Sequence, residues 1–290
     1  MGKSKLDIGL RQVRVLCQMP QKKRLEVIAQ GLPIILSSAQ GFRQASLALK
    51  SNLREAEVLA GFAEEEAAKI LILIDAVRCP TKILPSRMGP IVSWFYDHLA
   101  RLIYADAVTW KPMHVAQLRE YVDMSRRAHY VDGLVGEYIL PNWSIYERES
   151  RLYADIEDYG DGNIRWNSPT NQVLDFFTSS DHALSVAEAM SALGMFTIEG
   201  LKATSEVWGQ VAFTSMEGHS DAEHLTKELL RRLVSERLLS EDVTQADVNV
   251  LFDRWQLPMY DFDFSPIHAS RVELRAEQQS ILWSEINGLY

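Results

Sequence analysis

The chain has 290 residues, of which 47% are hydrophobic and 24% charged, a composition typical of one large or two ordinary globular domains. No apolar run approaches the roughly 18–20 residues that a membrane span requires. Two cysteines are too few for a disulfide framework, which agrees with a reducing compartment. We therefore expect a soluble, cytoplasmic protein that does not enter membranes.

The formal net charge of −9 is unevenly distributed along the chain. Residues 1–24 carry seven lysines and arginines against one aspartate, 7 − 1 = +6, so the remainder carries 23 − 38 = −15. Basic clusters contact phosphates, which makes Lys22, Lys23 and Arg24 candidate nucleic-acid-binding residues. The alternative is a solvated segment that pairs with the protein's own acidic surface.

Apolar residues at helical spacing predict a mostly helical chain. We expect the first helix to begin at Pro33 and the third to open at Pro90, because a proline in the first turn loses no hydrogen bond. Cys79-Pro80 should end the second helix. A capping box of Ser220 and Glu223 predicts the start of another helix. The expected helices cover about residues 33–50, 53–77, 89–107, 113–127, 181–208, 221–239, 244–255 and 270–289.

Residues 140–169 depart from the helical pattern. The runs "RLYADI" and "NIRW" are β-like and flank "EDYGDG", in which Asp161-Gly162 is a strong turn signal. These features predict a β-hairpin between two helical parts.

The segment "LAGFAEEEAAKILILID", residues 59–75, places three glutamates and a lysine in an otherwise apolar helix. Small residues form the middle of its apolar stripe, so the helix belongs inside a bundle. Glu66 lies at the edge of this stripe and is expected inside the bundle. Glu65 and Lys69 are four residues apart in the favourable acid-before-base order. The group could be a structural ion pair or a functional polar cluster, because buried charges need partners in either case.

Three further acidic residues share another side of the same helix, where exposure to solvent is the simplest expectation. These residues are Glu57, Glu64 and Asp75.

The stretch "LREAEVLAGFAEEEAAKILILID" resembles the second helix of the AbiV family of abortive-infection proteins, which belong to the HEPN superfamily of helical domains. Glu65, Glu66 and Lys69 occupy the family's Glu-Glu-x-x-Lys positions. "FYDHLARLI" is similar to the third-helix pattern of an aromatic, a histidine and a base, here His98 and Arg101.

"RLYADIEDYGDGNIRWNSP" is similar to the family's Tyr-Val-Asp, Gly, Trp, Pro ending, with Tyr153, Asp155 and Trp166 as its structural motif. The resemblance covers about residues 34–169. It implies an all-α, HEPN-like antiparallel helical bundle with a small β-hairpin insertion, followed by a further helical C-terminal part. We divide the chain into a basic segment 1–30, an AbiV/HEPN-like domain 31–175 and a helical region 176–290.

The resemblance implies an antiphage effector that blocks growth or translation, with candidate catalytic residues Glu65, Glu66, Lys69, His98 and Arg101. In an enzymatic version His98 would be the general acid or base, Lys69 and Arg101 would hold a phosphate, and the glutamates would orient them. Expected partners are a second copy of the chain, RNA or the translation machinery, and a phage-encoded trigger or partner protein.

Catalysis itself stays open. No arginine is followed by a histidine after four to six residues, the ribonuclease motif of many HEPN toxins. The alternative function is a non-enzymatic dimeric binding module that sequesters a protein partner, and the acidic body favours it. For His98 the alternative is a structural contact beside a surface pair of Asp97 and Arg101.

The remaining motifs give little indication of a metal or cofactor site. The segment "HSDAEH" offers His219, Asp221 and His224 as metal ligands, but a helix cap explains it as well. The chain has no GxxxxGK[ST], GxGxxG or GxSxG motif. The sequence therefore predicts no metal and no cofactor.

Overall fold

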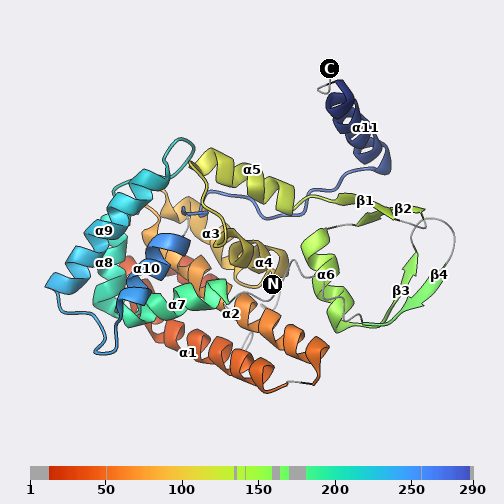
Figure 1. Ribbon diagram of the computed structural model, residues 1–290. Coiled ribbons are helices and arrows are strands. Elements are labelled where there is room, and N and C mark those ends of the chain that lie inside the picture. The colour runs from red at the N-terminus through yellow and green to blue at the C-terminus, as the bar shows by residue number, and fades with distance from the viewer. Residues whose placement is uncertain are drawn as a thin grey trace, which may run out of the picture.

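The computed structural model describes residues 13–49, 51–133, 136–140, 142–158, 164–169, 181–255 and 257–287. The described chain is mostly helical, as predicted (Figure 1). The helices are η1 (Val13–Gln18), α1 (Gln21–Ala48), α2 (Leu53–Arg78), α3 (Leu84–Trp94), α4 (His98–Ala107), α5 (Val115–Ser125), α6 (Trp143–Leu152), α7 (His182–Ala192), α8 (Ile198–Trp208), α9 (His219–Ser235), α10 (Gln245–Arg254) and α11 (Arg271–Asn287). None of them, within these residues, combines the length and apolar character that crossing a bilayer requires.

Helix α2 lies at the centre of the fold, where it packs against α1, α3, α4, α7 and α8 (Figure 1). Its small residues Ala60, Ala63 and Ala67 are buried, which lets these neighbours approach closely. The helix ends at Arg78 because Pro80 pushes Cys79 into an extended conformation, with φ −68° and ψ 131°. The predicted second helix and its stop signal are thus confirmed.

Two proline signals were misjudged. Helix α1 begins at Gln21, so Pro33 lies inside it rather than at its start. Pro90 lies inside α3, and the predicted third helix is in fact the two helices α3 and α4. The break falls at Asp97, whose carboxylate accepts from the N–H of Ala100 (2.8 Å) and thereby caps α4.

Two other boundaries also differ from the prediction. The helix expected over 181–208 is divided at Gly194, which has φ +77°. A Cβ there would lie 2.0 Å from the Leu238 carbonyl oxygen, so only glycine fits this turn. Helix α9 is capped not by Ser220 but at Gly218, whose N–H donates to Asp221 Oδ2 (2.7 Å).

The described strands form two antiparallel hairpins. The pair β3 (Asp155–Asp158) and β4 (Ile164–Asn167) confirms the predicted hairpin, and the expected turn at Asp161-Gly162 lies outside the described residues. The pair β1 (His129–Gly133) and β2 (Gly136–Leu140) was not predicted.

Buried residues on both sides of residues 175–176 belong to one hydrophobic core. Ile70 and Ile103 share it with Leu201 and Tyr260. The predicted domain boundary itself lies outside the described residues. Whatever the boundary, helices α7 to α10 and the segment 257–264 complete the core around α2.

A fully buried ion pair joins α2 to this C-terminal segment. The Asp75 carboxylate accepts from Arg78 Nε (2.6 Å), from the Tyr104 hydroxyl (2.8 Å) and from the N–H of Met259 (2.7 Å). The Arg78 guanidinium lies 5.0 Å from the centroid of the Trp208 ring and 4.8 Å from that of Trp255. The expectation that Asp75 faces solvent was therefore wrong, because residues far along the chain supply its partners.

Candidate functional site

The centre of the candidate site is Glu65, a carboxylate that α2 holds in a buried position, 4% exposed. Its Oε2 lies 2.7 Å from His98 Nδ1 of α4. Its Oε1 accepts from Arg148 Nε of α6 at 2.6 Å. Arg101 Nη1 of α4 lies 3.4 Å from Oε2. One buried acid thus joins three helices, and we call Glu65, His98, Arg101 and Arg148 the Glu65 cluster.

The hydrogen-bond partners of His98 determine which of its ring nitrogens carries the proton in the neutral form. Its Nδ1 is 2.7 Å from Glu65 Oε2 and 2.8 Å from Arg101 Nη2. Arginine can only donate and a carboxylate can only accept, so Nδ1 cannot satisfy both neighbours. A proton on Nδ1 gives the charge-assisted bond to Glu65, the stronger of the two. Arg101 retains the backbone carbonyls of Asp97 (3.2 Å) and Tyr96 (3.4 Å) as acceptors. In the neutral ring Nε2 is then a proton acceptor.

His98 differs from the rest of the cluster in its access to solvent. Its side chain is 49% exposed, whereas those of Arg101 and Arg148 are 9% and 16% exposed. Burial lowers the pKa of the Arg101 guanidinium, and the facing Glu65 carboxylate opposes that shift. A histidine oriented by a buried carboxylate and open on its other side is an arrangement suited to proton transfer.

Arg148 was missed by the sequence analysis, which expected no helix between residues 140 and 169. Its helix α6 is capped by Asn142, whose side chain accepts from the N–H of Ile145 (3.1 Å) and donates to the Ser125 carbonyl (2.7 Å). The asparagine ahead of "WSIYERESRL" was the available signal, as an N-cap residue. The Arg148 guanidinium also lies 6.0 Å from the centroid of the Phe62 ring.

Glu66 and Lys69 lie beside this cluster and pair with each other. Lys69 Nζ donates to Glu66 Oε1, and it lies 5.5 Å from the centroid of the Phe95 ring. The sequence analysis therefore exchanged the roles of the two glutamates. Glu65 is the buried acid, Glu66 is partly exposed at 20%, and Lys69 pairs with Glu66 rather than with Glu65. Glu65, Glu66, Lys69, Arg101 and Arg148 together carry 3 − 2 = +1 with His98 neutral.

Glu64 has a different role from its neighbour. Its carboxylate accepts from the N–H groups of Ala183 (2.9 Å) and Leu184 (3.2 Å), so it caps α7 from another part of the chain. Burial raises the pKa of Glu64 to about 7. Burial likewise raises the pKa of Asp106 to about 7, and the Glu147 carboxylate adds to that rise. The expectation that Glu64 is solvated was wrong.

The basic candidates lie at the start of α1. Lys22 and Lys23 are exposed, and Lys23 pairs with Glu26 (3.2 Å). Arg24 donates to the carbonyls of Leu16 (2.9 Å) and Met19 (2.8 Å), and burial lowers its pKa. Arg24 thus fastens η1 to α1, and only the two lysines extend into solvent.

The residues of the expected structural motif lie on the β3–β4 hairpin and just before it, outside the Glu65 cluster. Tyr153 and Trp166 are 58% and 78% exposed. Asp155 Oδ1 accepts from the N–H of Ile156 (2.7 Å).

No group of three or more His, Cys, Asp or Glu side chains in the described part of the chain is arranged to hold a metal ion. Of the possible ligands in "HSDAEH", Asp221 serves as the capping acid of α9.

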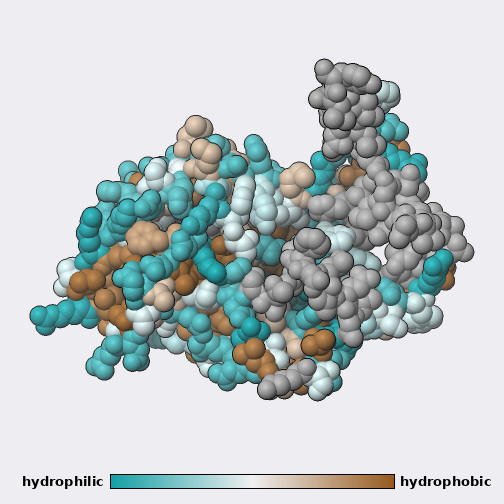
Figure 2. Space-filling model, in the orientation of Figure 1, coloured by the Kyte–Doolittle hydropathy of each residue, from teal (hydrophilic) through white to brown (hydrophobic). Residues whose placement is uncertain are grey.

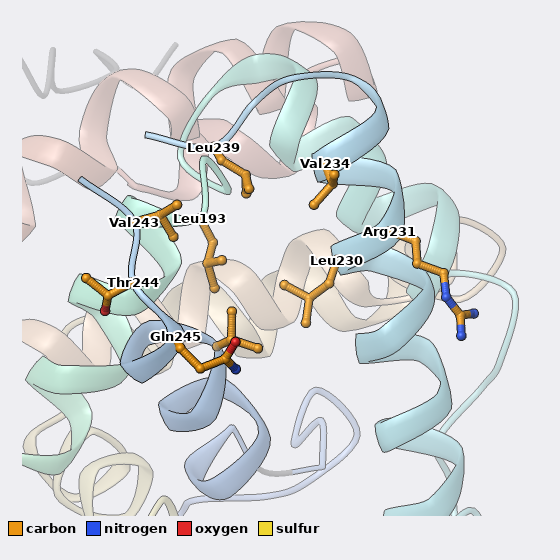
Figure 3. Close-up of a pocket in the computed structure, with 9 residues that line it drawn as sticks. Leu193, Leu230, Arg231, Val234, Leu239, Val243, Thr244 and Gln245 are labelled. Carbon is orange, nitrogen blue, oxygen red and sulfur yellow. The ribbon is translucent and has the colours of Figure 1, made fainter. Parts of the chain in front are cut away.

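An apolar hollow of about 530 Å³ lies at the other end of the helical body, between α7, α9 and α10. Figure 2 shows a hydrophobic patch over this region, and Figure 3 shows Leu193 and Leu230 facing each other within the hollow. The Arg231 guanidinium points away from them (Figure 3). The hollow is open, carries no charged group directed inward and offers no acid–base chemistry, which leaves the Glu65 cluster as the candidate catalytic site.

Comparison of the chain with protein-family models, with curated proteins and with solved structures finds no match. The resemblance to the AbiV family therefore stays a prediction that rests on the residues quoted above. The site is defined by its geometry: a buried carboxylate, an exposed histidine and two arginines, held by α2, α4 and α6.

Proposed function

We propose that this protein is an antiphage effector of the AbiV/HEPN type that arrests growth or translation by cleaving RNA at the Glu65 cluster. The observation that carries the proposal is the 2.7 Å contact between Glu65 Oε2 and His98 Nδ1, with His98 half exposed. Such a pair fixes the tautomer of the imidazole and directs its second nitrogen to a substrate.

The proposed reaction uses the 2′-hydroxyl of RNA as the nucleophile. His98 Nε2 accepts the 2′-hydroxyl proton while the 2′-oxygen forms a bond to phosphorus. The bond from phosphorus to the 5′-oxygen breaks, and that oxygen takes a proton from water. The hydroxide left behind is neutralised by the proton that His98 Nε2 took up, which restores the neutral imidazole. The products are a 2′,3′-cyclic phosphate and a 5′-hydroxyl. Arg101, Arg148 and Lys69 offset the charge that develops on the phosphoryl oxygens.

The test is to incubate the purified protein with total cellular RNA and with transfer RNA, with and without a chelator. The decisive variant is His98→Asn, because the asparagine amide keeps a donor near the Nδ1 position but cannot exchange a proton. The matched control is His219→Asn, since His219 on α9 lies outside the cluster. We expect cleavage by the wild type and by the control but not by His98→Asn, with 2′,3′-cyclic phosphate ends.

Cleavage by His98→Asn at the wild-type rate would remove His98 from the mechanism. Cleavage by none of the three proteins would reject the ribonuclease. Cleavage that stops with chelator would reject the metal-independent reaction written above.

A second candidate function is sequestration of a protein partner without catalysis. Two observations favour it: the charge of −15 outside residues 1–24, which repels RNA, and the ability of the Glu65 ion pairs to act purely as a brace between α2, α4 and α6. The discriminating variant replaces Lys22 and Lys23 by alanine, because these exposed lysines are not part of the folded core. Weaker RNA binding supports the nuclease, whereas unchanged growth arrest with no RNA binding supports sequestration.

A further inference from the structure

Helix α6 carries Arg148 to the Glu65 cluster, yet hydrophobic packing does little to hold this helix in place. In Figure 1 it lies at the edge of the helical body, beside α4. None of its ten residues, all of them described, is buried. Ile145 packs against the hydrophobic core but stays partly exposed. Near the end of the helix Arg151 Nε lies 4.0 Å from Glu57 Oε2, an ion pair at the surface that contributes little. The orientation of α6 therefore depends on stronger polar contacts.

Asn142, the residue just before α6, supplies such contacts and is itself buried, 4% exposed. Its Oδ1 accepts from the N–H of Ile145 at 3.1 Å, and its Nδ2 donates to the Ser125 carbonyl at 2.7 Å. Ser125 is the last residue of α5, where the carbonyls have no partner within their own helix. One amide thus caps α6 and fastens it to the end of α5, 17 positions earlier in the chain.

The contact with Ser125 acts on Arg148 through the stiffness of the helix. Arg148 is 148 − 142 = 6 residues beyond Asn142, which is about 9 Å along a helix. A tilt of about 10° around the Asn142 end displaces Arg148 by roughly 1.5 Å. The 2.6 Å contact between Arg148 Nε and Glu65 Oε1 then exceeds the length of a hydrogen bond. A small rotation of α6 therefore decides whether Arg148 binds Glu65.

Arg148 and His98 share one carboxylate. Glu65 Oε1 accepts from Arg148, while Oε2 lies 2.7 Å from His98 Nδ1. The positive charge of Arg148 offsets part of the Glu65 charge and disfavours a second positive charge on the imidazole. When Arg148 moves away, the Glu65 carboxylate favours the protonated ring more strongly. The position of Arg148 therefore affects the pH at which His98 becomes a base.

We propose that Asn142 is a positioning residue of the Glu65 cluster: through α6 it holds Arg148 against Glu65, and it thereby sets the charge that faces His98. Asn142 acts through Arg148 rather than on a substrate. Its part in catalysis rests on the proposed ribonuclease, whereas its effect on His98 does not.

The experiment is an NMR titration of the His98 imidazole in the full chain, with the signal assigned by its loss in His98→Asn. Arg148→Gln removes the charge and should raise the titration midpoint by roughly half a pH unit, because the imidazole is half exposed and partly screened. Asn142→Ser should reproduce most of this shift. Serine still caps the helix, but its hydroxyl is one bond short of the amide nitrogen that reaches Ser125.

The matched control is Thr197→Ala. Thr197 caps α8 with the same pair of contacts, since its Oγ1 accepts from the N–H of Gly200 (2.9 Å) and donates to the Gly194 carbonyl (2.9 Å). Helix α8 contributes no residue to the Glu65 cluster, so the His98 midpoint should stay at its wild-type value. Circular dichroism should show wild-type helix content in Asn142→Ser and in the control.

A wild-type midpoint in Asn142→Ser overturns the proposal, because α6 would then hold Arg148 without the contact to Ser125. An unshifted midpoint in Arg148→Gln overturns it as well, since Arg148 would not act on His98. An equal shift in Thr197→Ala also overturns it, because general loosening of the fold would then explain the effect.

If the wild type cleaves RNA, the pH profile of kcat should move in Asn142→Ser by the same amount and in the same direction as the His98 midpoint. A profile that stays in place while the midpoint moves overturns the catalytic part of the proposal. Absence of cleavage by the wild type rejects the ribonuclease alone, because the titration tests the positioning role without RNA.

Discussion

Replacing Asp75 by alanine should destabilise the protein far more than removing a comparable acid at the surface. Asp75 is 0% exposed and is the acceptor for Arg78, Tyr104 and Met259. Without it, the buried Arg78 guanidinium loses the Asp75 carboxylate, and removing one member of a buried ion pair costs about 3–5 kcal/mol. The N–H of Met259 loses its acceptor as well, at roughly 1–3 kcal/mol. The sum, about 4–8 kcal/mol, is comparable to the whole stability of many proteins.

The assay is urea unfolding followed by tryptophan fluorescence, because the rings of Trp208 and Trp255 lie 5.0 and 4.8 Å from the Arg78 guanidinium. With a urea m value of about 3 kcal/mol per molar, the midpoint should fall by about 1.5 M or more. Asp123 supplies the matched control: it also pairs with an arginine three residues later, Arg126, but is 46% exposed. Asp123→Ala should cost less than about 1 kcal/mol.

Equal effects of the two substitutions would refute the reasoning, because burial would then not distinguish the pairs. A loss below about 1.5 kcal/mol for Asp75→Ala would also refute it, since that is no more than an ordinary hydrogen bond contributes.

Two further predictions concern Glu64 and the turn at Gly194. The pKa of Glu64 is raised from 4.5 to about 7, so as pH rises through this window the unfolded chain loses the proton first, and the free energy of unfolding falls. The difference of 7 − 4.5 = 2.5 between the two pKa values corresponds to about 3 kcal/mol. Glu64→Gln should remove this fall in the free energy of unfolding between about pH 5 and 8. Curves of unfolding free energy against pH that run parallel for the wild type and the variant would contradict this prediction. Gly194→Ala should cost about 2 kcal/mol or more because of its φ of +77° and the contact with Leu238. Gly31→Ala, inside α1 with open space around it, should stabilise by about 0.5–1 kcal/mol; thermal melts that rank the two variants otherwise would count against this account.

Local sequence patterns predicted those parts of the fold that depend on contacts between residues close in sequence. The stop of α2 before Pro80 and the β3–β4 hairpin were predicted because each depends on a few adjacent residues. The start of α1 was not, since Pro33 was taken as a boundary although the tertiary fold tolerates it within a helix. The division of 181–208 depends on Gly194, whose requirement comes from the distant carbonyl of Leu238.

The same distinction explains the acids of α2. Helical periodicity divides the side chains into faces but cannot say which faces distant segments cover. Asp75 and Glu64 were assigned to solvent, yet Met259 and the N-terminus of α7 supply their partners. The resemblance placed Glu65, His98 and Arg101 in one candidate site together with Glu66 and Lys69, and in the structure the first three side chains lie in contact. Arg148 was missed because its helix was not expected.

Glu65 and Asp75 show that one helix can carry both a structural acid and a candidate catalytic acid. Both are buried acids on α2 and both bind arginine, ten positions apart. Every partner of Asp75 is itself buried: Arg78 and Tyr104 as side chains and Met259 as backbone. Its charge can therefore only hold the fold together. Glu65 differs in one respect, because its partner His98 is half exposed. A proton gained or lost at His98 can exchange with solvent or a substrate, whereas none can at Asp75. If α2 takes part in a reaction, it does so through Glu65.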